Sequence, residues 1–91
     1  MSNKEEMIKT IFREKPTAML LNLYNKGKDV SYASNLAKEI DCTYSHCVKV
    51  IQKFQKAGYI DFNRSGRIKE LSLTKNGKEI CENLNKVKNL L

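Results

Sequence analysis

Three cysteines and one histidine are the residues of this 91-residue chain whose side chains could together bind a transition metal. Cys42 and Cys47 flank His46, and Cys81 follows much later, so the four could form a Cys3His zinc set. However, a helix through this stretch turns His46 about 100° away from Cys47, and a C-x4-C spacing lacks the tight knuckle of structural zinc sites. We interpret the cysteines as small buried hydrophobic residues and expect no metal.

His46 could also act as a general base if a nucleophile and an orienting carboxylate lay at its helical neighbours. Neither is present at those positions, and the chain has no glycine-rich phosphate loop and no paired carboxylates. The sequence therefore predicts neither an enzyme nor a cofactor. His46 has instead the chemistry to contact a base edge or a phosphate group.

Basic residues are concentrated in one part of the chain, which indicates an anionic partner. Residues 42–78 contain eight basic and two acidic residues, so this stretch carries +6 of the net charge of +7. Such a stretch is typical of nucleic-acid-binding proteins, although it is also compatible with a lysine-rich solvated surface. No run of residues is apolar and long enough to cross a membrane, and the odd cysteine count suits a reducing compartment. We expect a cytoplasmic protein without a membrane partner.

The stretch that begins at Thr43 predicts a helix with two chemically different faces. Thr43 is suited to cap the N-terminus of this helix, and Gly58 is suited to end it. Cys47, Ile51 and Phe54 recur at helical spacing and form an apolar stripe that faces a core. The opposite face carries hydroxyl, amide, imidazole and ammonium groups but no carboxylate: Tyr44, Ser45, His46, Lys49, Gln52, Lys53 and Lys56. We therefore predict that this helix is the recognition helix of a helix-turn-helix.

Three earlier helices are predicted by apolar residues at helical spacing. They are expected over 3–14, over 17–26 after the single proline, and over 32–40 with Ser31 as the N-cap. The last of these is joined to the helix after Thr43 by a very short turn. A connection of this length is typical of a helix-turn-helix, which we place at about 31–57.

Beyond residue 58 the apolar residues alternate, which predicts strands. Two alternating runs within 59–73 flank the turn Arg64-Ser65-Gly66-Arg67 and predict a two-stranded β-hairpin. Thr74 is then expected to cap a final helix over about 75–90. Together these elements predict one α+β, mainly α domain over 1–91, a winged helix-turn-helix whose hairpin forms the wing.

Two segments of the chain also resemble a known protein family. The segments T-Y-S-H-C-V-K-V-I-Q-K-F-Q-K-A-G-Y-I and L-S-L-T-K-N-G-K-E-I are similar to those of MarR-type winged-helix regulators, especially the short archaeal relatives. The match covers about Val30 to Glu82, and its most specific pieces are G-Y-I at 58–60 and L-T-x-x-G at 73–77. The resemblance implies that the recognition helix enters the DNA major groove while the wing reaches the backbone or the minor groove. It would make Tyr44, Ser45, His46 and Lys49 groove-facing, and Arg64 and Arg67 wing contacts.

The basic helix face and the resemblance together give the residues expected to contact double-stranded DNA. These are Thr43, Tyr44, Ser45, His46, Lys49, Gln52, Lys53, Lys56, Arg64, Ser65 and Arg67. We predict a sequence-specific transcriptional regulator that represses by occluding polymerase. Two alternatives remain open, namely an architectural or chromatin-type DNA binder and a winged-helix protein-interaction module of a larger assembly.

Apolar residues near both ends of the chain predict self-association. The C-terminal helix carries apolar residues at spacings of 4, 3 and 4, which is a short heptad-like seam. The residues expected to form a homodimer interface are Met7, Ile8, Ile11, Leu84, Val87 and Leu91. The alternative is that these stripes pack on the domain's own helices. Typical members of the resembling family are longer and build an effector pocket with their terminal helices, so a small-molecule effector is not expected here.

Overall fold

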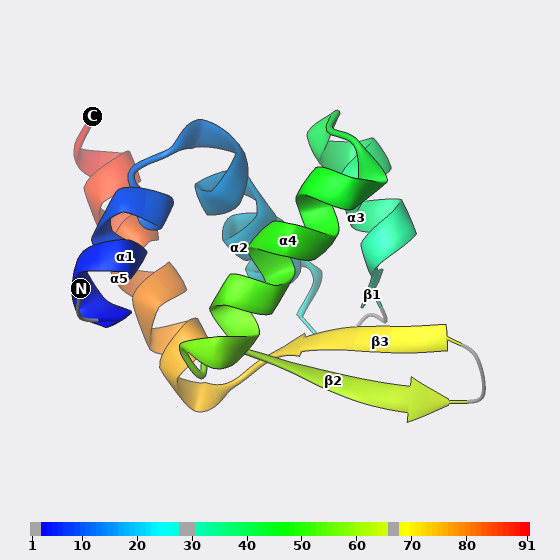
Figure 1. The fold of residues 1–91 in the computed structure, drawn as a ribbon. Coiled ribbons are helices and arrows are strands. Elements are labelled where there is room, and N and C mark those ends of the chain that lie inside the picture. The colour runs from blue at the N-terminus through cyan, green and yellow to red at the C-terminus, as the bar shows by residue number, and fades with distance from the viewer. Residues whose placement is uncertain (1–2, 28–30, 66–67) are drawn as a thin grey trace.

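The computed structural model describes residues 3–27, 31–65 and 68–91, and for residues 3, 4, 6, 7, 64, 65, 68 and 69 it describes the backbone alone. Within these residues, five helices and three strands follow one another in the order seen in Figure 1: α1 (Asn3–Ile11), α2 (Glu14–Lys26), β1 (Ser31–Tyr32), α3 (Ala33–Ile40), α4 (Tyr44–Lys56), β2 (Ile60–Ser65), β3 (Ile68–Leu73) and α5 (Lys75–Leu90). No helix in these described ranges is long and apolar enough to cross a membrane.

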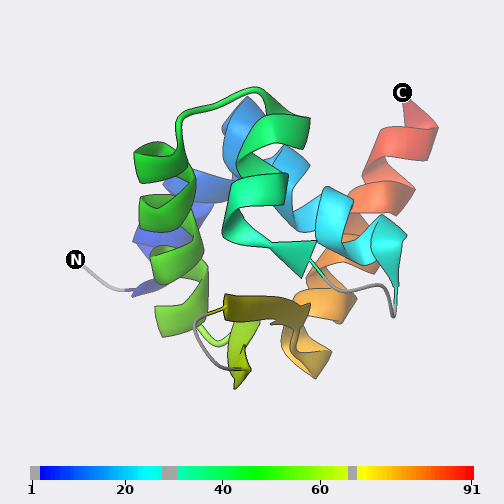
Figure 2. The same cartoon turned by 90° about the vertical axis from the view of Figure 1, so that its right-hand side faces the viewer.

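The three strands form one antiparallel sheet in the order β1-β3-β2, which lies beneath the helices in Figure 2. The predicted hairpin is confirmed, because β2 and β3 pair along their whole length from Ile60 opposite Leu73 onward. The predicted turn was too long, since Arg64 and Ser65 belong to β2 and pair with Lys69 and Ile68. The interpretation of Ser31 as a helix cap was wrong. Ser31 lies in β1 opposite Leu71, and α3 begins after Tyr32, whose side chain makes no capping bond.

The boundary between α1 and α2 also differs from the prediction. Helix α1 ends at Ile11, three residues earlier than expected, and α2 begins at Glu14 rather than after the proline. Pro16 therefore lies in the first turn of α2, where its missing N–H removes no intrahelical hydrogen bond. The residue before the helix, Arg13, is extended, with φ of −108° and ψ of 145°. A sharp corner results between the two helices.

The core lies between the helices and the sheet. The predicted stripe of Cys47, Ile51 and Phe54 is confirmed as buried, and Val50 is buried beside it. The buried apolar residues come from α2, α3, α4, α5 and the sheet: Met19, Leu20, Leu23, Leu36, Ala37, Cys47, Val50, Ile51, Phe54, Ile60, Leu71 and Cys81. Because α4 contributes four of these, its buried face is fixed and its opposite face must point to solvent.

Local hydrogen bonds determine where α3 ends and α4 begins. Asp41 adopts the left-handed conformation with φ of 61°, and the N–H groups of Asp41 and Cys42 donate to the carbonyls of Lys38 and Ala37 at 3.2 and 3.0 Å. This is the Schellman arrangement that ends a helix. The capping role predicted for Thr43 is confirmed, because its hydroxyl oxygen accepts a bond from the His46 N–H at 3.1 Å. Three residues thus complete the turn of the helix-turn-helix.

The end of α4 is hydrogen-bonded to the beginning of α5, at a place that we call the helix junction (residues 58–59 with 74–77). Gly58 has φ of 84° and ends α4 in the left-handed conformation. Thr74 donates from its N–H to the Tyr59 carbonyl at 3.0 Å and from its hydroxyl to the Gly58 carbonyl at 2.5 Å. The same hydroxyl accepts from the Gly77 N–H at 3.0 Å and so caps α5. The G-Y-I and L-T-x-x-G segments therefore contact each other directly.

Candidate nucleic-acid interface

The solvent-facing side of α4 carries an exposed polar stripe formed by Ser45, Lys49, Gln52 and Lys56. Their spacings of 4, 3 and 4 place them on one face, opposite the buried side chains of the same helix. Tyr44 is 60% exposed at the N-terminal end of the helix. The stripe thus presents hydroxyl, amide and ammonium groups, which are the groups that bind base edges and phosphates.

The remaining residues of the predicted site lie around this stripe. Thr43 is exposed, and its hydroxyl oxygen is engaged in capping α4. Arg64 and Ser65 lie at the end of β2, where the structure describes their backbone. Arg67 lies outside the described residues. The structure therefore places four residues of the predicted site on one face of α4 and shows the backbone of the strand that leads to the wing.

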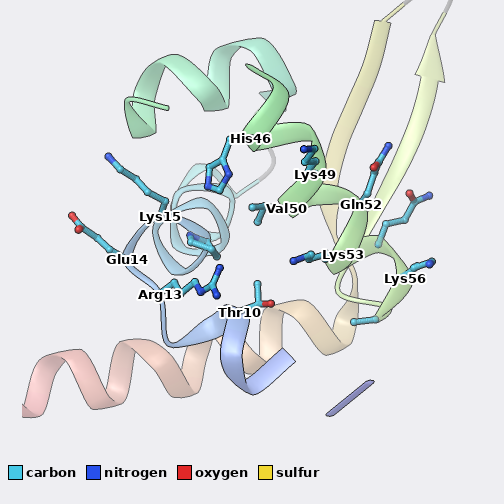
Figure 3. Close-up of a pocket in the computed structure, with 13 residues that line it drawn as sticks. Thr10, Arg13, Glu14, Lys15, His46, Lys49, Val50, Gln52, Lys53 and Lys56 are labelled. Atoms are coloured by element: carbon cyan, nitrogen blue, oxygen red, sulfur yellow. The ribbon is translucent and has the colours of Figure 1, made fainter. Parts of the chain in front are cut away.

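A cavity of about 920 Å³ lies along α4, between this helix and the corner where α1 meets α2. We call it the basic groove. One wall is formed by Thr10 and Arg13–Pro16, and the other by residues of α4 with Ala57 at its end: His46, Lys49, Val50, Gln52, Lys53, Gln55, Lys56 and Ala57. Its floor includes the buried side chains of Pro16 and Val50. Figure 3 shows that α4 separates the groove from the β2–β3 hairpin. Helix α4 therefore has a basic cavity on one side and the hairpin on the other.

Basic side chains enter the groove from both walls. Figure 3 shows Arg13 and Lys53 pointing toward each other across the cavity, with His46 above them. Glu14 is the one acidic residue among the described residues that line the groove, and its side chain points away from it. Lys15 also points outward, and its ammonium group donates to the Ile40 carbonyl at 2.8 Å. The interior of the groove is therefore positively charged.

The sequence prediction missed the contribution of the α1–α2 corner. Residues 1–41 carry a net charge of only +1, so a count by segment gives Arg13 and Lys15 no weight. Folding brings both residues opposite α4, where they line the same cavity as residues of that helix. The group Arg13-Glu14-Lys15-Pro16 could have indicated an anion site, because it places basic residues at the start of a helix. The first turn of a helix favours a nearby anion.

The cysteines occupy apolar positions away from this surface. Cys47 and Cys81 are fully buried, and their thiols lie 3.6 Å from the Ala33 carbonyl and 3.5 Å from the Leu20 carbonyl. Burial raises the pKa of each thiol to about 11, and for Cys47 the neighbouring Cys42 adds to this effect. Such thiols stay protonated near neutral pH. Across the described ranges, no three His, Cys, Asp or Glu residues are arranged to hold a metal ion.

Apolar side chains are exposed at the end of the molecule opposite the hairpin. Ile8 in α1 and Phe12 just after it are 48% and 82% exposed, and Val87 in α5 and Leu91 just after it are 57% and fully exposed. The two helices lie at this same end, α1 on the side of α4 and α5 on the other side (Figures 1 and 2). Three members of the predicted interface differ from the exposed ones. Ile11 and Leu84 are partly buried against the core, and the Met7 side chain lies outside the described part of the structure.

Known proteins are similar to this chain in sequence and in structure. No protein-family model matches the chain. The chain is 29% identical over 87 residues to an uncharacterized protein of Archaeoglobus fulgidus, a match that covers 92% of this chain and 90% of that protein. The crystal structure of AF1382 from A. fulgidus is similar with a TM-score of 0.83 and 26% identity, covering 92% of this chain and 94% of that one.

A regulator of known role is also similar in structure. MepR, a transcription regulator of the Staphylococcus aureus multidrug efflux pump MepA, gives a TM-score of 0.80 at 16% identity. The match covers 93% of this chain and 64% of the MepR chain. At this identity the likeness establishes the fold, and it agrees with the arrangement of α2, α3 and α4 followed by the hairpin. The chain therefore has a winged helix-turn-helix fold, which it shares with MepR.

Proposed function

We propose that this protein is a transcription regulator that binds double-stranded DNA in a sequence-specific manner and represses by occluding polymerase. The observation that carries the proposal is the exposed stripe Ser45–Lys49–Gln52–Lys56 on α4, a helix of thirteen residues without a carboxylate. A helix of this kind fits the major groove, where its hydroxyl, amide and ammonium groups meet base edges. The winged-helix fold supports this role by analogy.

The experiment that tests this function is the selection of bound sites from random duplex DNA, followed by variants of the selected site. We expect a consensus sequence. On that site, Lys49→Ala should weaken binding by about 1–3 kcal/mol and relax the preference at one base position, because a base-edge contact is lost. Fluorescence anisotropy with the selected duplex and single-base variants measures both effects.

Two controls separate the alternatives. Lys86→Ala removes an exposed lysine of α5 and should leave both affinity and base preference unchanged. If selection returns no consensus while the protein still binds duplex DNA, an architectural binder replaces the regulator. If the protein binds no duplex at all, the exposed Tyr44 and the half-buried Val48 on α4 become candidates for a protein contact instead.

The proposal includes a homodimer formed through α1 and α5. Exposed apolar side chains at the end of the molecule opposite the hairpin support it, and two-fold symmetry would let two copies of α4 read neighbouring half-sites. Val87→Lys together with Leu91→Lys should shift the protein from dimer to monomer in light scattering, because two ammonium groups would then meet at the seam. Both positions are exposed in one copy, so the melting temperature of the monomer should change little.

Leu84 gives the contrasting control for this experiment. Because Leu84 is partly buried against the core, Leu84→Lys should lower the melting temperature as well as any dimer content. A wild-type protein that is already monomeric at high concentration would contradict the dimer. Loss of folding in the Val87 and Leu91 double variant would assign those side chains to the domain itself.

A further inference from the structure

The basic groove lies on the side of α4 that faces away from the hairpin. A recognition helix in the major groove, which is about 12 Å wide, has a sugar–phosphate strand on each side. The hairpin is positioned to approach one of these strands. The other strand would pass along the opposite side of α4, where the structure has a cavity with positive side chains.

We infer that the basic groove seats the sugar–phosphate backbone of the second DNA strand, and that Arg13 is its principal phosphate contact. The inference rests on the proposed DNA-binding function and extends it to the α1–α2 corner. It makes the protein hold DNA at three places, which are the α4 stripe, the hairpin and this corner. Arg13 thereby has a role equivalent to that of a wing arginine, on the other side of the recognition helix.

The charges in the groove select a phosphate as its occupant. Arg13 and Lys53 enter from opposite walls, while the carboxylate of Glu14 points away. The guanidinium of Arg13, which is exposed at the wall of the groove, attracts an anion there. The guanidinium of Arg13 can donate two parallel hydrogen bonds to one phosphate, which gives geometric as well as electrostatic selectivity.

The corner is also held in place for this role. Lys15 donates to the Ile40 carbonyl at 2.8 Å and so ties the start of α2 to the last residue of α3. Pro16 is buried in the first turn of α2 and fixes the backbone there. Arg13 itself is exposed and makes no side-chain capping bond to α2. Its side chain is thus available to a ligand while its backbone is fixed relative to α4.

The test compares salt dependence of binding for the wild type, Arg13→Ala, Arg13→Lys and the control Lys86→Ala. The probe is a fluorescein-labelled duplex of mixed sequence about two helical turns long, titrated at several KCl concentrations. Because the proposed dimer carries two Arg13 side chains, loss of both phosphate contacts should make the slope of log affinity against log salt shallower by about 1.8 and weaken binding about sixtyfold near 0.1 M salt. Arg13→Lys should retain most of the slope, and Lys86→Ala should retain all of it.

The outcomes separate this inference from the proposed function. If wild type binds with a steep salt slope and Arg13→Ala has the same slope and affinity, the groove does not hold DNA and the inference alone is overturned. If wild type binds no duplex, the proposed function fails and the inference with it. If inorganic phosphate raises the melting temperature of wild type but not of Arg13→Ala, while the DNA slope is unchanged, the groove is a small-anion site and the inference is again overturned.

Folding of the variants is checked by thermal melts followed by circular dichroism. Arg13→Ala should melt with wild type, because the side chain makes no capping bond. Should Arg13→Ala prove unstable, Arg13→Gln keeps the length and the hydrogen-bonding capacity of the side chain but removes its charge. A shallower slope in Arg13→Gln with full recovery in Arg13→Lys supports the inference, and an unchanged slope in Arg13→Gln overturns it.

Discussion

Gly77→Ala is expected to lower the free energy of unfolding by about 3 kcal/mol, which is the upper part of the range for overpacked sites. A Cβ at this position would lie 2.1 Å from the carbonyl oxygen of Tyr59 and 3.2 Å from a methyl carbon of Leu73. The carbonyl cannot simply move away, because it accepts the Thr74 N–H at 3.0 Å. The substitution therefore forces the start of α5 away from the end of α4. Thermal denaturation should show a melting temperature lower by roughly 12–24 °C for a domain of this size.

The sign of the effect makes this prediction sharp. In an ordinary exposed helix, glycine to alanine stabilises by about 1 kcal/mol because alanine has the higher helix propensity. Asn76→Ala, in the same first turn but exposed, is the matched control and should change the melting temperature little. If Gly77→Ala stabilises the protein, the close contact with Tyr59 is absent in solution.

Salt should have the largest effect on DNA binding. A dimer that neutralises about 6 to 10 phosphates should lose about 10³ to 10⁵ in affinity between 50 and 200 mM salt, with a linear relation between log affinity and log salt. The expectation follows from the lysines of α4, from Arg13 and from the basic residues of the hairpin, because each phosphate contact releases condensed counterions. Anisotropy titrations of one duplex over a series of KCl concentrations give the slope directly.

A variant series identifies which lysines contribute to that slope. Lys53→Ala with Lys56→Ala should reduce its magnitude, whereas Lys86→Ala, outside the predicted interface, should leave it unchanged. An affinity that hardly responds to salt would contradict binding through the phosphate backbone. Equal reductions for Lys56→Ala and Lys86→Ala would assign the effect to net charge rather than to defined contacts.

The sequence predicted well those elements whose ends are marked by a capping residue or a turn-forming glycine. Helix α4 was expected between Thr43 and Gly58, and the structure has the cap and the left-handed glycine at those positions. The hairpin was expected from alternation around a glycine-containing turn. In contrast, β1 has only two residues, Ser31 and Tyr32, so it has no detectable period. Its partner Leu71 is forty positions away in the chain, and serine alone favoured a helix cap.

The candidate site was predictable where it lies on one helix and not where it joins two parts of the chain. Periodicity placed Ser45, Lys49 and their neighbours on one face of α4, because spacing within a helix determines direction. Arg13 comes opposite that face only through the packing of α2 against the rest of the fold. For the same reason, spacing predicted an apolar stripe at Leu84 and Val87 but not that Leu84 contacts the core while Val87 is exposed.

The helix junction fixes the orientation of α5 relative to α4. Because Thr74 donates hydrogen bonds to both Gly58 and Tyr59, the end of α4 and the start of α5 are held together at the helix junction. Helix α5 has sixteen residues and is about 24 Å long, so a tilt of about 10° at the helix junction displaces its far end by about 4 Å. In a dimer joined at that far end, the angle between α5 and α4 would determine the distance between the two α4 helices. The DNA spacing that such a dimer tolerates would then be decided at Gly58 and Thr74, far from any base.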